Sequence, residues 1–80
     1  MALALLFLGR LEDVAGGSER AVPFAPTLDA LLAALEPDLA EALRGPRIRL
    51  AHNGGLVADP AGLALADGDE LAFLPPVSGG

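Results

Sequence analysis

The leucine-rich segment from residue 28 to 43 constrains the fold more than any other part of this chain. Its leucines recur three or four positions apart, the spacing that gathers side chains on one face of a helix. They are Leu28, Leu31, Leu32, Leu35, Leu39 and Leu43. Pro37 would break a helix interior but suits a first helical turn, so the segment predicts two helices, Leu28–Leu35 and Pro37–Leu43. Thr27 is well placed to cap the first of them.

Short strand-like runs flank this helical segment on both sides. The expected strands are 2–8, 20–24, 48–52, 56–57 and 70–74. Pro23 suggests that its strand lies at a sheet edge, and Asn53-Gly54-Gly55 is typical of a tight hairpin turn. The first strand is apolar at every position, so both of its faces are expected to meet apolar groups. The order ββαβββ predicts an α+β domain, a mixed sheet with its helices on one face.

Length and composition predict a single small domain. Eighty residues bury only about 60 to 65% of the surface of the unfolded chain, so the core must be rich in apolar side chains. Seventeen leucines and a hydrophobic fraction of 52% meet this demand. The chain has no cysteine, which excludes disulfides and cysteine-based metal sites or nucleophiles. We expect a folded domain at 1–74 and an extended tail at 75–80.

Charge and hydropathy argue against nucleic-acid and membrane partners. The net charge of −6 opposes binding to phosphates. Arg44, Arg47 and Arg49 form a local basic cluster, which we interpret as a solvated edge at the end of the second helix. The apolar run at 2–8 is closed by Arg10, far short of the roughly 20 residues of a membrane span. No basic segment precedes it, so the chain is expected to be cytoplasmic.

The inventory of reactive side chains is too small for an ordinary active site. The chain has one histidine, two serines and one threonine, and no lysine or tyrosine. His52 flanks the expected hairpin turn and has no second histidine with which to bind a metal, so no metal site is predicted. Asp67, Asp69 and Glu70 lack the ligand spacing of a calcium loop, and a solvated turn is the preferred interpretation.

The C-terminal residues Pro75-Pro76-Val77-Ser78-Gly79-Gly80 offer a different kind of chemistry. Gly79 and Gly80 have no side chains, so this end can enter a cleft too narrow for other residues. Pro75 and Pro76 favour an extended stalk, which over six residues reaches about 20 Å. The Gly80 carboxylate is then the covalent handle. A carboxylate is a poor electrophile, so an ATP-dependent activating partner is implied.

The stretch from Asp67 to Gly80 closely resembles the C-terminus of the small subunit of molybdopterin synthase, a ubiquitin-like sulfur carrier. The order of an apolar strand, a leucine-rich helix, an Asn-Gly turn and this ending extends the resemblance to all 80 residues. It implies a ubiquitin-like β-grasp fold in which an E1-like adenylyltransferase adenylates Gly80 and sulfur then gives a thiocarboxylate. The tail would insert into the large synthase subunit, in a heterotetramer, and donate sulfur to a pterin precursor. The resemblance also implies that the catalytic residues belong to these partners. No permanently bound cofactor is implied, and ATP is used by the activating enzyme.

The resemblance also implies a surface for these partners. It places Phe7 and Leu5 on the outer face of the sheet, and Leu56 is expected to complete the patch. In the last strand, charged Glu70 marks its own face as outward, so Leu74 should be exposed beside the tail. The other expected partner-binding residues are Pro75, Pro76, Val77 and Ser78. Alternatively, the loop 59–66 covers this face.

Three other functions remain open from the sequence. Sulfur carriers for thiamine share the fold and the diglycine but usually lack the Pro-Pro-Val that precedes it here. A carrier for tRNA thiolation fits the same two features, whereas a protein modifier fits the diglycine only. A purely structural domain is the remaining alternative.

Overall fold

The structure is a computed structural model that describes residues 2–45 and 47–75. Its strands are β1 (Ala2–Phe7), β2 (Glu19–Pro23), β3 (Arg49–His52), β4 (Gly55–Leu56) and β5 (Glu70–Leu74). Its helices are α1 (Leu11–Ala15), α2 (Leu28–Ala33), α3 (Pro37–Leu43) and the 3₁₀ turn η1 (Pro60–Gly62). Most of the expected tail, residues 76–80, lies outside the described residues.

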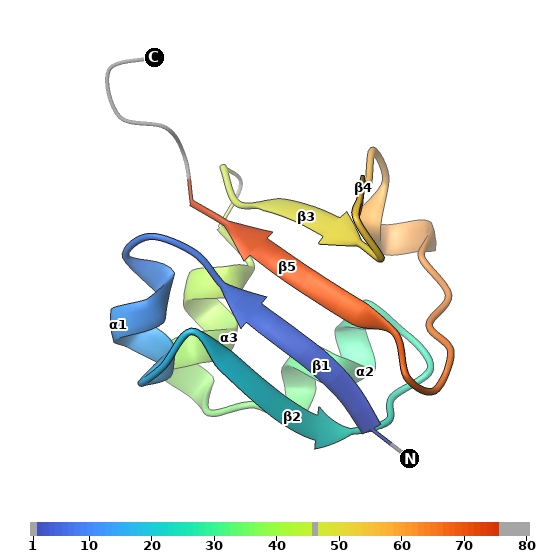
Figure 1. Cartoon of the computed structure of the whole chain (residues 1–80), viewed down its shortest axis with the longest axis horizontal. Helices are drawn as coiled ribbons and strands as arrows, with labels where there is room; N and C mark the ends of the chain where they lie inside the picture. The colour runs from blue at the N-terminus through green and yellow to red at the C-terminus, as the bar shows by residue number, and fades with distance from the viewer. Residues whose placement is uncertain (1, 46, 76–80) are drawn as a thin grey trace.

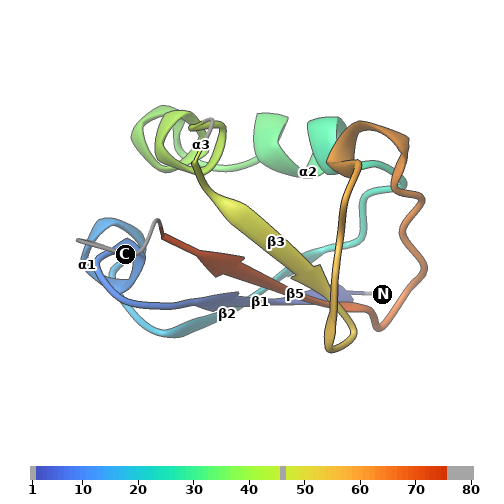
Figure 2. The same cartoon turned by 90° about the horizontal axis from the view of Figure 1, so that it is seen from above.

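The five strands form one mixed sheet in the order β2-β1-β5-β3-β4. The first and last strands, β1 and β5, are parallel neighbours at its centre, and the other three pairs are antiparallel. Helices α2 and α3 cover one face of this sheet, and α1 lies beyond the end of β1 (Figures 1 and 2). The expected α+β architecture with helices on one face is therefore confirmed.

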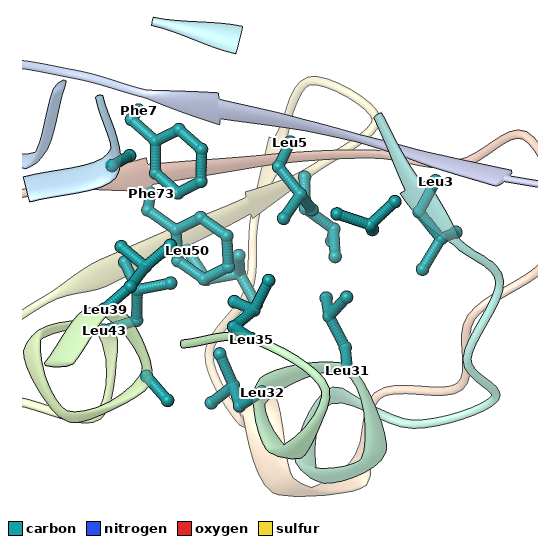
Figure 3. Close-up of a cluster of buried hydrophobic side chains, with 14 of the residues drawn as sticks. Leu3, Leu5, Phe7, Leu31, Leu32, Leu35, Leu39, Leu43, Leu50 and Phe73 are labelled. Carbon is teal, nitrogen blue, oxygen red and sulfur yellow. The ribbon is translucent and has the colours of Figure 1, made fainter. Parts of the chain in front are cut away.

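The core lies between the sheet and the leucines of the helical segment (Figure 3). Alternate residues of the two central strands point into it: Leu3, Leu5, Phe7, Leu71 and Phe73. Leu31, Leu32, Leu35, Leu39 and Leu43 face them from the helical side. Phe7 and Phe73 occupy paired positions of the parallel strands and stack with their ring centroids 5.8 Å apart. Such stacked aromatic pairs stabilise the core beyond the effect of burying their apolar area.

The prediction of two helices separated by Pro37 is confirmed. Helix α3 has the expected bounds, with Pro37 in its first turn. The Thr27 hydroxyl accepts a hydrogen bond from the amide of Ala30 at 3.2 Å, as an N-cap does. Helix α2 ends at Ala33 instead of Leu35, yet Leu35 remains buried in the core.

The sequence pattern missed α1, a five-residue helix between the first two strands. Only Leu11 and Ala15 of α1 are buried, which is too little periodicity to detect. Arg20 on β2 holds this helix in place, because its guanidinium donates to the Ala15 carbonyl at 2.8 Å and to the Glu36 carboxylate at 2.7 Å. The hydrogen bond from Arg20 to the Glu36 carboxylate lowers the pKa of Glu36. Strand β2 lies at the sheet edge, as Pro23 predicted.

The placement of Phe7 and Leu5 on the outer face is wrong. Phe7 is 2% exposed and Leu5 is fully buried, and both point toward the helices (Figure 3). Because side chains alternate along a strand, it is Leu6 and its even-numbered neighbours on β1 that face outward. The first strand is apolar on both sides, so its composition alone did not reveal which side is the core.

Phe7→Ala is therefore expected to destabilise the fold instead of only a partner interface. Removing a buried phenylalanine ring costs about 3 to 5 kcal/mol, a large share of the stability of a small domain. Urea unfolding followed by circular dichroism measures this loss. Leu56→Ala is the control, since Leu56 is 69% exposed and its truncation should change the free energy of unfolding by no more than about 0.5 kcal/mol. Equal stability of the two variants would contradict the core assignment.

Candidate functional site

The C-terminal tail begins where the two central strands end together. The amide of Leu8 donates to the Phe73 carbonyl at 3.1 Å, which fixes the end of β5 against the end of β1. Leu74 and Pro75 follow directly, and Pro75 is the last described residue. The other residues expected to transfer sulfur or contact a partner in the tail lie outside the described part: Pro76, Val77, Ser78, Gly79 and Gly80. The tail thus leaves the domain from a central strand that is paired on both sides.

The face of the sheet opposite the helices carries a continuous apolar row. Strand pairing places Leu6 beside Ala72, Ala72 beside Ala51, and Ala51 beside Leu56. These four residues, called here the outer-face row, cross β1, β5, β3 and β4 in turn. Leu56 is the most exposed large apolar side chain among the described residues. Leu74 was expected to be exposed but is half-buried. It points to the same side of β5 as Ala72, as predicted, so the row lies beside the start of the tail.

The loop 59–66 does not cover the outer-face row. Its turn η1 packs against α2 on the helical side of the sheet (Figure 2). Leu65 from the same loop is buried in the core. The expectations that Glu70 marks the outward face and that Leu56 is exposed are thus confirmed. The arrangement suits docking of a flat apolar surface, with charges at its margin from Glu70 and Arg49.

Arg49 is the member of the basic cluster that belongs to this face. It is exposed, pairs across the sheet with Leu74, and precedes buried Leu50. Arg44 is the C-cap of α3 and Arg47 follows it in the connection to β3. The cluster therefore divides between a helix end and the sheet, and its three guanidinium groups do not form one row along a single element.

A polar cluster joins the β3–β4 turn to the start of β5. The Asp69 carboxylate accepts hydrogen bonds from His52 Nε2 at 2.6 Å and from Asn53 Nδ2 at 3.1 Å. It also accepts one from the amide of Ala66 at 2.9 Å, while Asn53 Oδ1 accepts one from the amide of Glu70 at 2.8 Å. Asn53 adopts a positive φ of 49° to make these contacts. A carboxylate only accepts, so His52 Nε2 carries a hydrogen here.

This cluster is structural in the described residues. The hydrogen bonds from Ala66, His52 and Asn53 lower the pKa of Asp69 from 3.8 to about 2. Asp67 binds the amide of Ala2 at 2.7 Å and so ties the same turn to β1. Within residues 2–45 and 47–75, no three His, Cys, Asp or Glu side chains are grouped so as to hold a metal ion. The predicted turn is correct, but the carboxylates of Asp67 and Asp69 accept hydrogen bonds and are not merely solvated.

The comparisons with known proteins point to one family. The sequence model of the ThiS family matches residues 5–80. No curated protein matches the chain at a significant level. In the described part of the chain, no helix has the length and apolar character needed to cross a membrane.

Several solved structures share this fold over nearly the whole chain. The crystal structure of SAMP1 from Haloferax volcanii is 34% identical, with all of both chains covered and a TM-score of 0.77. A chain in the complex of subunits 1 and 2 of molybdopterin-converting factor from Helicobacter pylori is 30% identical, with all of both chains covered and a TM-score of 0.73. CysO from Mycobacterium tuberculosis, at 24% identity, 94% and 99% coverage and a TM-score of 0.73, supports the fold alone.

Asp69→Asn is expected to flatten the pH dependence of stability in acid. Because the folded-state pKa of Asp69 is about 2 and its ordinary value is 3.8, its contribution is complete well above pH 4 and is lost as the pH falls toward 2. Urea midpoints measured from pH 2 to pH 7 should fall less steeply below pH 4 in the variant, which is already weaker at pH 7. Glu41→Gln, an exposed carboxyl on α3, is the control and should leave the profile unchanged. Parallel profiles for Asp69→Asn and the wild type would contradict this assignment.

Proposed function

Because this chain belongs to the ThiS family of ubiquitin-like sulfur carriers, we propose that the Gly80 carboxylate carries sulfur as a thiocarboxylate. The observation that carries the proposal is the match to the family model, which extends through Gly80. The structure is consistent with it, because the central strand β5 leads directly into the tail. The sparse set of reactive side chains is consistent with this role. In such a carrier the chain supplies the reagent, and the partners supply the catalytic groups.

The chemistry proceeds in two steps that need no side chain from this protein. An E1-like enzyme joins a Gly80 carboxylate oxygen to the α-phosphorus of ATP and releases pyrophosphate. Sulfide-level sulfur (HS⁻) from a donor then attacks the carbonyl carbon and expels AMP with the broken C–O bond, which leaves the C–S bond of the thiocarboxylate and releases a proton. Adenylation is needed because it converts a poor leaving group into a good one. The adjacent Gly79 leaves the carbonyl open to attack from either side.

We propose the molybdopterin pathway as the destination of this sulfur. The Pro75-Pro76-Val77 sequence before the diglycine and the similarity to the Helicobacter pylori complex support it. The partner would then be a large synthase subunit that receives the tail and transfers sulfur to a pterin precursor. Docking would use the outer-face row and Leu74, in place of the buried Phe7 and Leu5.

A second candidate is a protein modifier, which the 34% identity to SAMP1, the small archaeal modifier protein 1 of Haloferax volcanii, favours. In that role Gly80 would form an isopeptide bond with an amine of another protein. The chain contains no lysine, so it cannot build lysine-linked polymers of itself. Intact-mass and gel analysis of protein isolated with its activating enzyme separates the two roles, because a carrier yields free thiocarboxylate and a modifier yields larger adducts.

Deleting Gly80 should abolish thiocarboxylate formation without unfolding the protein. Every core residue in the described part lies at or before Phe73. The deletion therefore removes the residue whose carboxylate is proposed to react and removes no core side chain. Circular dichroism checks the fold, and mass spectrometry after incubation with the activating enzyme, ATP and a sulfur donor checks the product. Oxidation of Met1 has the same nominal mass shift as exchange of oxygen for sulfur, so C-terminal fragment ions must place the change. Thiocarboxylate on the truncated chain would refute the proposal.

Leu56→Ala should weaken binding of the large subunit at least fivefold, equivalent to about 1 kcal/mol. Leu56 ends the outer-face row with a side chain that is 69% exposed, so the loss reflects contact and not stability. Calorimetric titration measures the affinity. Val14→Ala, an exposed apolar residue of similar kind on α1, is the matched control and should bind as the wild type does. Equal affinities for wild type and Leu56→Ala would remove the row from the interface.

A further inference from the structure

Gly9 lies directly against the residue from which the tail departs. The loop after β1 and the end of β5 are side by side in both views (Figures 1 and 2). A Cβ atom on Gly9 would lie 2.9 Å from Cγ and 3.7 Å from Cδ of Pro75. The first distance is closer than real Cβ contacts, so the ring or the backbone would have to shift. The Pro75 ring can change its pucker at Cγ but cannot rotate away, because it is closed onto its own backbone nitrogen. A side chain at position 9 is therefore expected to displace Pro75.

Gly9 differs in this respect from the other described glycines of positive φ. Gly9, Gly16, Gly54 and Gly68 have φ values of 56°, 81°, 88° and 88°. A Cβ on any of the last three would meet no atom within 4 Å. Their backbone conformation alone explains them, since left-handed φ favours glycine. At Gly9 the conformation and the contact with Pro75 both require glycine, so a structural role in the turn is not its whole explanation.

The neighbouring hydrogen bonds make this contact a fixed support. The amide of Leu8 is bonded to the Phe73 carbonyl, and the Gly9 carbonyl accepts the amide of Glu12 at 3.2 Å in the first turn of α1. Gly9 is thus held on one side by β5 and on the other by α1. Pro75 rests on a backbone that has little freedom to move away.

We propose that Gly9 is a positioning residue that sets the direction in which the tail leaves the sheet. The inference rests on the proposed function, because direction matters only if Gly80 must enter a partner's active site. Five residues follow Pro75, and at full extension they span at most about 17 Å, so a small rotation at Pro75 is amplified at Gly80. A misplacement of about 1 Å at a reacting group can cost about a hundredfold in rate.

ATP–pyrophosphate exchange with the activating enzyme tests the proposal. Gly9→Ala is expected to lower kcat at least tenfold and to leave KM for the carrier within about twofold, because it adds one methyl group beside Pro75 and leaves the exposed side chains of the domain unchanged. Gly16→Ala is the matched control, since it carries the same strain of positive φ on the same connection but contacts nothing. Both variants should lose a similar few degrees of thermal stability, and Gly16→Ala should keep the wild-type kcat. Wild-type kcat in Gly9→Ala would overturn the proposal.

A double-mutant cycle identifies the contact itself. Pro75→Ala removes the Cγ and Cδ atoms that a side chain at position 9 would meet, so adding Gly9→Ala to it should lower kcat less than twofold further. Equal losses in both backgrounds would overturn the proposal.

Nuclear Overhauser effects between the Gly9 Hα and the Pro75 ring of the wild type test the contact without any activity or variant. Their presence is expected, and their absence would overturn the proposal even if Gly9→Ala fails to fold. If the wild-type chain supports no ATP–pyrophosphate exchange, the proposed function is refuted instead. The nuclear Overhauser effects would then be the remaining test of the contact between Gly9 and Pro75.

Discussion

The parallel pairing of β1 with β5 is the constraint on which the rest of the molecule depends. It joins the first and last elements of the chain at the centre of the sheet, and it brings Phe7 and Phe73 into the stack that fills the core. The same pairing decides where the chain can leave the domain. A tail attached to an edge strand would start from a weaker support than one attached to the centre.

The elements with strong local signals were predictable from the sequence. Helix α3 and strand β5 have the predicted bounds, and Thr27, Pro23 and Pro37 act as their chemistry suggests. Two features depended on tertiary context. Helix α1 is too short to show a helical periodicity of apolar residues. Strand β1 is apolar on both faces, so only the pairing of β1 with β5 decides that Leu5 and Phe7 lie in the core. The Gly9–Pro75 contact joins residues 66 positions apart and left no local trace.

The polar chemistry of the chain serves geometry more than reactivity. His52, Asn53 and Asp69 resemble a catalytic cluster in composition, yet their hydrogen bonds satisfy the backbone at the entry to β5. Arg20 likewise binds two helix ends. The cluster around Asp69 holds the start of the strand that leads to Gly80, and the hydrogen bond from the Leu8 amide to the Phe73 carbonyl holds its end. A carrier that relies on the active sites of its partners needs this rigidity, because its own contribution is the place at which the carboxylate is presented.

The two outer strands of the sheet determine how this protein can associate with others. Strand β2 contains Pro23, which has no amide hydrogen to offer a new neighbour, and β4 is only two residues long. Neither border can readily accept a strand from another molecule, so the sheet resists growth into fibres despite its apolar outer face. Contact through a face alone forms no backbone ladder, so a partner can leave without breaking a continuous sheet. In the proposed role of sulfur carrier, this would allow the protein to pass from the activating enzyme to the sulfur acceptor.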